Sequence, residues 1–563
     1  FNALTLSPAL CALLLRRREP PKKGFFAAFN RWFARRMDKY TAFTPTLIRH
    51  VARTGVFIAA VLAVIFLVWR KLPAGFLPEE DQGYVMVMVS TPEASSLQVT
   101  QKAMIRADEV IRTLPEVAST SFAAGFNMMA GIASTDSGII FVSLVGYSDR
   151  KLTAMEIAQK LTDELYMAVP GAECFAFIPP SIPGLGITSG VSVEVQDLEG
   201  RGTAYLLEQS ERLMDSLRKL PSVASVTTQF NAGVPQRRLR IDKEQALASG
   251  VDLGVLYGDL TTLLGGAYVN NFSRFGKLYQ TYIQAAPAYR MDKRSLDSYY
   301  VASSSGESVP VSSLVEVVDT VGVEYVSQFN LYRSIGLTVT PAARTSTTTV
   351  MQDITRTAAQ VLPDDVGTAW SGTSFQEANA SKTGGLVYLL ALVFVFLALA
   401  ALYESWGLPL AILMSVPVAV LGAVLFIGVS HLLNAFYVND IYMQISLVML
   451  IGLAAKNAIL VVEYADRLFN EQGASLMDAA IGAAKLRVRP IIMTAFAFIL
   501  GVMPLIFASG VYATARNIMG VALVGGMLFA TLLGIFVYPA LYYFVGRIGG
   551  FERRRERKKQ EQS

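Results

Sequence analysis

Long apolar runs, separated by polar connections, are the main pattern of this chain. A helix rises about 1.5 Å per residue and the hydrocarbon core of a bilayer is about 30 Å thick, so about 20 apolar residues can cross it. Six such runs predict transmembrane helices at Thr54–Trp69, Leu386–Tyr403, Leu408–Val429, Ile441–Tyr464, Pro490–Ser509 and Gly520–Val545. A shorter run, Phe1–Leu15, is interpreted as the end of a further span.

The long segment between the first two of these six runs has the pattern of a folded domain in water. Period-2 runs at Gly83–Ser90 and Gly138–Val145 predict strands. The segment Ser96–Leu114 instead places its apolar residues at helical spacing. Strands that alternate with amphipathic helices predict an α+β portion outside the membrane.

One β-α-β unit recurs within this segment. The first unit ends in Leu-Pro-Glu-Val-Ala-Ser at 114–119, and the second, with strand Val191–Gln196 and helix Ala204–Leu220, ends in Leu-Pro-Ser-Val-Ala-Ser at 220–225. A weaker third copy comprises Ile335–Thr340, Ser346–Leu362 and Val366–Trp370. Repetition at this scale predicts duplicated subdomains.

Residues 231–324, between the second and third copies, differ in composition. They are richer in Gly, Ser and Tyr, and their strand-like pieces are the short segments Arg237–Ile241, Tyr279–Gln284 and Val309–Val311. We therefore expect this stretch to be an inserted subdomain.

Composition narrows the class of protein. Hydrophobic residues make up 53% of the chain and charged residues 17%, against roughly a quarter charged in ordinary soluble domains. The mean hydropathy of +0.42 is too high for a purely soluble enzyme and too low for a chain buried in lipid throughout.

Basic residues mark one side of the membrane. Segment 16–53 holds eleven lysines and arginines, 465–489 holds four and 547–563 holds seven, whereas the turns 430–440 and 510–519 hold only Arg516. Because short cytoplasmic loops carry the excess of Lys and Arg, these three segments are predicted to be cytoplasmic. The α+β portion then lies on the opposite side. The net charge of +5 sits beside apolar runs, which argues against a nucleic-acid groove.

The chain lacks the residues that several kinds of catalysis and metal binding require. The chain has two cysteines and two histidines, so neither a disulfide framework nor a Cys/His metal cluster is expected. It contains no GxxxxGK[ST], GxSxG or HExxH motif. Because the chain has no phosphate-binding loop for a nucleotide, the energy source that remains for a membrane protein is an ion gradient. Such a gradient is worth about 2.3 kcal/mol per charge per 100 mV.

Lys456 is the principal candidate for coupling to such a gradient. It lies eight residues from the end of the span Ile441–Tyr464, which places its backbone about 12 Å inside the membrane. Burial of a lysine there costs about 2.5–3.5 kcal/mol on insertion scales, so a facing carboxylate is expected. Glu463 is two turns nearer the cytoplasm, and no other apolar span has a central acid, so the partner is expected outside this chain. The alternative is a partly snorkelled lysine that only anchors its helix.

Two further polar residues accompany Lys456. Thr494 places a hydroxyl at plausible depth in the span that Pro490 opens, although a threonine that bonds its own helix carbonyl is an equally good interpretation. Arg487 lies at the start of that span, where an interface anchor is the simplest interpretation.

Two stretches of the α+β portion combine flexible backbone with soft apolar side chains, as a pocket for varied apolar ligands requires. One is Phe122–Phe141, which contains Phe126, Met128 and Phe141. The other places Phe175 and Phe177 before a Pro/Gly-rich loop. Ordinary core aromatics at strand ends are the alternative.

Four separated motifs stand in order along the chain: LPAGFLPEEDQG at 72–83, AALYESW at 400–406, GLAAKNAILVVEYA at 452–465, and RVRPIIMT at 487–494 followed by GVMP at 501–504. Together they closely resemble the resistance-nodulation-division superfamily, within it the hydrophobe/amphiphile multidrug efflux branch. The resemblance covers essentially the whole chain and implies the C-terminal half of an inner-membrane transporter subunit of a Gram-negative bacterium.

The resemblance implies an α-helical polytopic membrane bundle with a large periplasmic α+β portion, built from repeated β-α-β porter subdomains and an inserted docking subdomain. The implied divisions are the end of the sixth helix at 1–15, a basic cytoplasmic segment at 16–53, a helix at 54–71, porter subdomains at 75–228, the docking subdomain at 229–324, a return to the porter at 325–371, five helices at 384–545 and a basic cytoplasmic tail at 546–563.

The implied function is secondary active transport, drug/proton antiport driven by the proton gradient, without enzymatic activity, cofactor or metal. The implied partners are the N-terminal half of the same transporter, two further copies in a homotrimer, a periplasmic adaptor, an outer-membrane channel, the lipid bilayer and small amphiphilic substrates. Nucleic acid is not among them.

The resemblance also implies residue roles. Lys456, Thr494 and Arg487 match the proton relay, whose two acidic partners would lie on the N-terminal half. Phe141 matches a deep-pocket phenylalanine, while Phe175 and Phe177 match aromatics of the entrance cleft. The glycine-rich switch loop corresponds to Gly125–Ser137 and includes Gly131, although Met128 and Met129 depart from the usual residues there.

Three other functions remain open at this point. A lipid or polypeptide exporter of the same superfamily would share the spans, but would be expected to lack the insertion at 229–324. A membrane sensor that does not transport would tolerate the change Lys456→Met. The third is a metal exporter, from the branch of the superfamily that is nearest to the multidrug branch. Such pumps lack the AAKNA pattern, and Met128 and Met129 alone are weak evidence for a soft metal.

Overall fold

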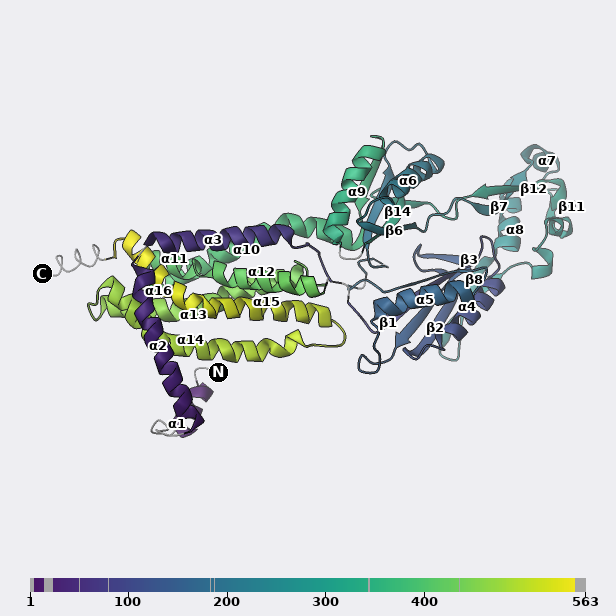
Figure 1. Cartoon of the computed structure of the whole chain (residues 1–563). Coiled ribbons are helices and arrows are strands. Elements are labelled where there is room, and N and C mark those ends of the chain that lie inside the picture. Colours follow the sequence, from purple (N-terminus) through teal and green to yellow (C-terminus); the bar gives the residue numbers. More distant parts are fainter. Residues whose placement is uncertain are drawn as a thin grey trace.

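The computed structural model describes residues 5–14, 24–49, 51–78, 80–182, 184–186, 188–342, 345–434 and 436–551. Parts of the first apolar run, of the basic segment and of the basic tail therefore lie outside the described residues. The molecule is elongated, with a helical bundle at one end and an α/β portion at the other (Figure 1).

Six helices of the described residues are long and apolar enough to cross a membrane: Ala52–Lys71, Gly385–Tyr403, Gly407–Leu433, Ile441–Asn470, Leu476–Ile506 and Ala513–Leu532. The structural elements that contain them are α3 (Val51–Lys71), α10 (Gly372–Tyr403), α11 (Gly407–Leu413) with α12 (Val416–Leu433), α13 (Ile441–Asn470), α14 (Leu476–Ile506) and α15 (Ala513–Leu532). Helix α16 (Gly534–Ile548) completes the bundle, and the amphipathic helix α2 (Phe25–Ile48) packs across its end. The short helix α1 (Ser7–Leu14) lies apart from the bundle, near the end of α2 (Figure 1).

Three boundaries differ from those expected. Residues 465–489 are mostly helical, because α13 continues to Asn470 and α14 begins at Leu476, where the Ser475 hydroxyl accepts a hydrogen bond from the Asp478 amide at 3.1 Å. The polar side chains of that first part of α14 hid the helix from a hydropathy criterion. The run Leu408–Val429 is divided between α11 and α12.

The last predicted span, Gly520–Val545, is two helices. It begins earlier, with α15 at Ala513, and is interrupted at Leu533 before α16. The Tyr538 hydroxyl donates to the Ala530 carbonyl at 2.6 Å and bridges the interruption. The two pieces therefore form one bent helical path.

A first α/β unit follows α3. Its elements are β1 (Tyr84–Ser90), α4 (Leu97–Ile111), β2 (Val117–Asn127), β3 (Ile132–Leu144), α5 (Ala154–Ala168) and β4 (Glu173–Phe177). The antiparallel sheet has the order β2-β3-β1-β4, the arrangement of a split β-α-β fold. Val85, Val87 and Val89 lie on one face of β1 and share a buried core with α4 and α5. The strands and the helix predicted here are confirmed, with β3 longer than expected.

The second and third sequence copies form a single second unit, since their strands lie in one sheet. Its elements are β5 (Val191–Asp197), α6 (Thr203–Leu217), β6 (Val223–Thr228), β14 (Tyr332–Pro341), α9 (Thr347–Val361) and β15 (Val366–Trp370). Apart from the short β13 (Ser327–Phe329), which pairs with β14, the strand order β6-β14-β5-β15 repeats that of the first sheet. Alternate residues such as Val193 and Leu337 pack under α6 and α9.

The residues between β6 and β13 form a projection with its own small core around Leu256 and Leu296. The antiparallel pair β7 (Val234–Ile241) and β12 (Val315–Gly322) connects it to the second unit. Its other elements lie toward the end of the molecule farthest from the bundle (Figure 1). They are α7 (Lys243–Ala248), α8 (Leu253–Leu260), β8 (Ala267–Arg274), β9 (Lys277–Ile283), β10 (Tyr300–Ala302) and β11 (Ser308–Pro310), with short π or 3-10 turns at Thr261–Gly265, Pro287–Tyr289, Lys293–Ser298 and Val311–Ser313.

Candidate functional site

A cleft of about 670 Å³ lies between the two α/β units. Its walls come from α5 and β4 of the first unit and from β5, β6 and β14 of the second unit. Small-molecule pockets commonly measure about 300–1,000 Å³, so the cleft has the size of a ligand site.

The open face of the first sheet is apolar. Because side chains alternate along strands, Met86 and Met88 of β1 point away from the helices. Met86 pairs with Phe141 on β3 and with Phe177 on β4, and Met88 pairs with Phe175 on β4. The Phe175 and Phe177 rings are stacked with centroids 5.8 Å apart. A continuous row of aromatic and methionine side chains thus crosses the sheet and ends at the cleft.

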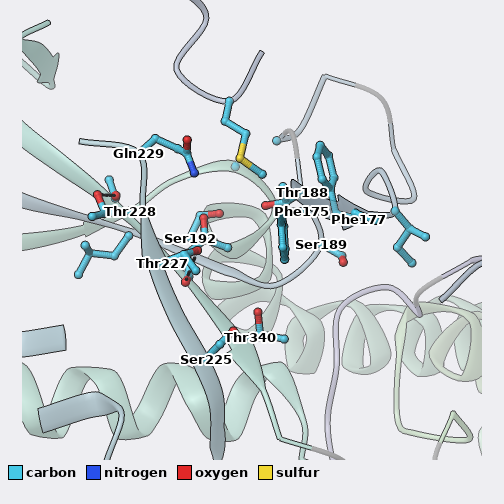
Figure 2. A pocket seen from close by; sticks show the side chains of 18 of the residues that line it. Phe175, Phe177, Thr188, Ser189, Ser192, Ser225, Thr227, Thr228, Gln229 and Thr340 are labelled. Carbon is cyan, nitrogen blue, oxygen red and sulfur yellow. Dashed lines mark hydrogen bonds between the residues drawn. The ribbon is translucent and has the colours of Figure 1, made fainter. Parts of the chain in front are cut away.

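The open face of the second sheet is rich in hydroxyl groups. Thr338 of β14 pairs with Ser192 of β5 on one side and with Thr227 of β6 on the other. Figure 2 shows Ser192 and Thr227 across the cleft from Phe175 and Phe177. The cleft therefore presents an apolar aromatic wall opposite a wall of small hydrogen-bonding groups.

The charges of the cleft have one sign. Its described lining residues include the carboxylates of Asp163 and Glu194 and no lysine, arginine or histidine. Glu194 is half-buried on β5, beside the hydroxyl row. This arrangement favours ligands that carry a positive charge.

The five predicted pocket residues are not all brought together. Phe175 and Phe177 line the cleft, together with Met129, which had not been selected. Met128 packs nearby with Phe177 in the cluster on the open face. Phe141 lies on that face two strands from β4, and Phe126 lies on β2 opposite Ala133, so neither lines the cleft. Strand register, which decides these positions, could not be read from the sequence.

The segment Gly125–Ser137, predicted as a switch loop, is largely a β-hairpin in the structure, and its role as a switch stays a prediction. Gly125 lies in β2 and Ser137 in β3, and only residues 128–131 form the turn of this hairpin. Glycine is required at two points, because Gly125 beside a bulge has φ of 90° and Gly131 in the turn has φ of 70°. The small residues that resembled a loop are instead strand residues.

In the bundle, Lys456 is exposed on a face of α13 that no described helix covers. No carboxylate of the described residues lies within ion-pair distance of it, and Glu463 pairs with Arg467 at 3.6 Å instead. Gly452 lies one turn away on the same stripe, and a Cβ atom placed there would meet nothing within 4 Å. This face of α13 is therefore open to a further packing partner.

Thr494 and Arg487 lie on the adjacent α14. The Thr494 hydroxyl donates to the Ile491 carbonyl of its own helix at 3.1 Å, which was the structural alternative for this residue. The Arg487 guanidinium lies 4.7 Å from the centre of the Tyr464 ring, near the C-terminal end of α13. Because α14 packs antiparallel to α13, Thr494 is about 10 Å deeper than Arg487 and close to the depth of Lys456. No hydrogen bond joins Lys456 to Thr494 among the described residues.

Two consecutive carboxylates connect the bundle to the first α/β unit. Glu80 accepts hydrogen bonds from the amides of Thr514 and Ala515 at the start of α15, at 3.2 and 2.7 Å. Burial raises the pKa of the Glu80 carboxyl, and the hydrogen bonds from the two amides lower it. Burial has the larger effect, so the pKa lies above its ordinary value. This residue lies in the first sequence motif, but its contact with α15 had no signal in the sequence.

Asp81, the next residue, contacts the first α/β unit instead of the bundle. It forms an ion pair with Arg150 at 2.7 Å and accepts from the Ala154 amide at the start of α5 at 2.7 Å. Burial raises the pKa of the Asp81 carboxyl, but the hydrogen bonds from Arg150 and the backbone outweigh it, so the pKa lies below its ordinary value. Glu80 and Asp81 thus fix the first turns of two helices in different parts of the molecule.

Asp440 is a buried acid that the sequence analysis did not select. It caps α13, where it accepts from the Met443 amide at 2.8 Å, and its other oxygen has no partner among the described residues. Burial, with a contribution from nearby Glu80, raises the pKa of Asp440 to about 7. The Asp-Ile junction at the start of an apolar run is an N-cap signal that could have located the residue but not its burial.

The six apolar helices of the described residues, beside a large α/β portion, define a multi-pass membrane protein with a substantial domain outside the bilayer. Residues 1–546 match the AcrB/AcrD/AcrF family, and the chain belongs to this family. The resemblance to the resistance-nodulation-division superfamily is thereby confirmed.

Curated relatives of this chain include efflux transporters of two genera. The toluene efflux pump membrane transporter TtgB of Pseudomonas putida is 36% identical over 559 residues, which cover 97% of this chain and 52% of that protein. The multidrug resistance protein MdtF of Escherichia coli is 34% identical over 559 residues, with 97% and 53% covered. The multidrug export protein AcrF of Escherichia coli is 33% identical over 554 residues, with 97% and 53% covered. The chain spans about half the length of the curated relatives it matches.

Proposed function

We propose that this chain forms the C-terminal half of a transporter subunit that exports hydrophobic and amphiphilic compounds in exchange for protons. The observation that carries the proposal is the open face of α13, where Lys456 has no carboxylate partner among the described residues. A lysine inside an apolar span is costly unless it is paired, so this face calls for an acid from outside the chain.

The coupling chemistry follows from that pairing. An aspartate on the N-terminal half, when ionised, pairs with the Lys456 ammonium. When it takes up a proton from the periplasm, the attraction is lost and the helices shift against each other. Thr494 and Arg487 lie on the neighbouring helix and serve the same relay.

The movement of the membrane helices is transmitted to the cleft through Glu80 and Asp81. Glu80 holds the start of α15 in the bundle, and Asp81 holds the start of α5 in the first α/β unit. Because the two residues are adjacent, a movement of α15 displaces α5, whose side chains line the cleft. The proposed result is alternate opening and closing of the cleft between the two units.

The two opposed walls of the cleft fit amphiphilic substrates. An apolar body packs on Phe175 and Phe177, while polar groups bond the hydroxyls of Ser192, Thr227 and Thr338. One relative is named a toluene efflux pump, another a multidrug/solvent efflux pump and a third a multidrug resistance protein, which agrees with a site that depends on surface type rather than on one shape.

The proposed setting is the inner membrane of a Gram-negative bacterium. The two α/β units are the porter subdomains in the periplasm, and the projection between β6 and β13 is the docking subdomain. The assembly is a homotrimer that meets a periplasmic adaptor and an outer-membrane channel. Helix α2, the C-terminal end of α13 and the N-terminal part of α14, which carries Lys485, Arg487 and Arg489, then lie on the cytoplasmic side.

The proposed function is tested by expressing the complete transporter, with its adaptor and channel, in a host without its own pumps. We expect preloaded cationic dye to leave the cells, and a protonophore to stop the export while ATP levels are maintained. Export that persists without a proton gradient would refute the coupling, and absence of export with any amphiphile would refute the transport function.

Charge selection in the cleft is a separate prediction. Replacement Glu194→Gln is expected to weaken the binding of monocationic amphiphiles about fivefold, since a partly exposed ion pair contributes about 1 kcal/mol. Neutral amphiphiles should be unaffected. The measurement is the half-saturating concentration for export of a cationic and a neutral dye of similar size. Glu199→Gln, on an exposed site outside the cleft, is the control, and equal losses for both dyes would contradict the assignment.

A further inference from the structure

A second cavity lies at the basic end of the bundle, far from the cleft. It measures about 250 Å³ and is bounded by α2, the start of α3, and the region from Leu533 into α16. Most of its walls are apolar, from Phe43, Leu47, Phe57, Leu533, Phe536, Val537 and Ala540. Its polar lining residues are Arg53 and Thr54.

Arg53 gives this cavity one charged edge. Its side chain is exposed, and no carboxylate of the described residues lies within ion-pair distance of it. Thr54 is buried beside it, with 8% of its surface exposed. Among the described residues, the cavity thus joins an apolar interior to one cation without an ion-pair partner at its rim, which complements a molecule with an acyl chain and an anionic head.

Helix α2 places this cavity at the surface of the bilayer. Tyr40 and Ile48 on one side of the helix are buried against the bundle, and the Tyr40 hydroxyl donates to the Ile535 carbonyl at 2.6 Å. The helix crosses the end of the bundle rather than running along it (Figure 1). Its exposed side carries Trp32 and four basic residues, Arg31, Arg35, Arg36 and Lys39. Basic amphipathic helices with exposed aromatics lie in the membrane interface and attract anionic lipids.

We propose that this cavity, the α2/α3/α16 groove, is a binding site for an anionic phospholipid. One acyl chain lies between Phe43, Phe57 and Val537, and the phosphate of the head group contacts the Arg53 guanidinium. The lipid fills a gap between α2 and the membrane helices, so its role is to hold α2 against the bundle. This site is independent of the substrate cleft and of the Lys456 relay.

The test measures lipid binding to the complete transporter purified in detergent. Phosphatidylglycerol and phosphatidylethanolamine with the same acyl chains are titrated in mixed micelles, and bound lipid is counted by native mass spectrometry. We expect phosphatidylglycerol to bind more tightly, and Arg53→Gln to reduce its affinity about fivefold and that of phosphatidylethanolamine by a smaller factor, because the ammonium of the latter partly neutralises the phosphate that contacts Arg53. The matched control is Arg70→Gln, an exposed arginine at the opposite end of α3.

Two further arms separate the alternatives. Ala540→Leu narrows the apolar interior and is expected to weaken the binding of both lipids. If Ala540→Leu does not fold, Arg53→Gln still tests the proposal, because Arg53 lies at an exposed position. Millimolar inorganic phosphate is expected not to compete. Equal loss with Arg53→Gln and Arg70→Gln, equal affinity for the two lipids, or competition by phosphate alone would each overturn the proposal.

Discussion

Replacement of Lys456 by methionine in the complete transporter is expected to abolish proton-coupled export while leaving membrane insertion and assembly intact. Methionine has nearly the length of lysine and removes only the charge. Because Lys456 is exposed on the open face of α13, its replacement breaks no ion pair or hydrogen bond among the described residues. The measurements are dye export from cells and the oligomeric state of the purified protein.

The matched control for this change is Lys71→Met. Lys71 is the last residue of the membrane helix α3, and its side chain is also exposed. We expect that variant to export at the normal rate. Drug resistance that survives Lys456→Met would remove this residue from the mechanism. Failure of Lys456→Met to assemble would assign the residue to folding instead.

Replacement Gly422→Ala is expected to prevent stable folding of the bundle. A Cβ atom on Gly422 of α12 would lie 2.4 Å from the carbonyl oxygen of Gly525 on α15 and 2.6 Å from the Phe529 Cβ atom. The backbone oxygen cannot move without separating the two helices, so the cost is that of an overpacked core, about 1–3 kcal/mol or more. The measurement is the yield of folded protein and its thermal unfolding temperature.

A control for this change lies on the same helix. A Cβ atom on Gly428 would meet only Val68 Cγ1, at the ordinary contact distance of 3.6 Å. Gly428→Ala is therefore expected to leave the yield unchanged or to raise it slightly, since alanine favours helix by up to about 1 kcal/mol. Equal yields from the two variants would contradict the packing of α12 on α15.

The helices and strands were predictable because their hydrophobic pattern is strong. Strand β1 and helix α4 were located to within a few residues, since Val85, Val87 and Val89 must reach one core. Helix starts were less predictable. The first turns of α14 carry Lys485 and Arg487, whose polarity hid a helix that the Ser475 cap in fact begins.

The sites were predictable as residue types but not as contacts. Phe175 and Phe177 were selected from the sequence as aromatics before a Pro/Gly-rich loop, and both line the cleft in the structure, whereas their role in binding substrate stays a prediction. Phe141 shares their sheet face but lies two strands away, and this depends on register, which no local pattern fixes. The hydroxyl wall was missed, because serines and threonines alternating with valines resemble an ordinary solvent-facing strand.

The lone lysine of α13 is the central claim, and its surroundings in the complete transporter test it most directly. A structure of the whole molecule in lipid should place the Lys456 ammonium within about 4 Å of an aspartate or glutamate from the other half. A Lys456 that faces bulk water, or a membrane interior without any acid, would contradict the proposed coupling.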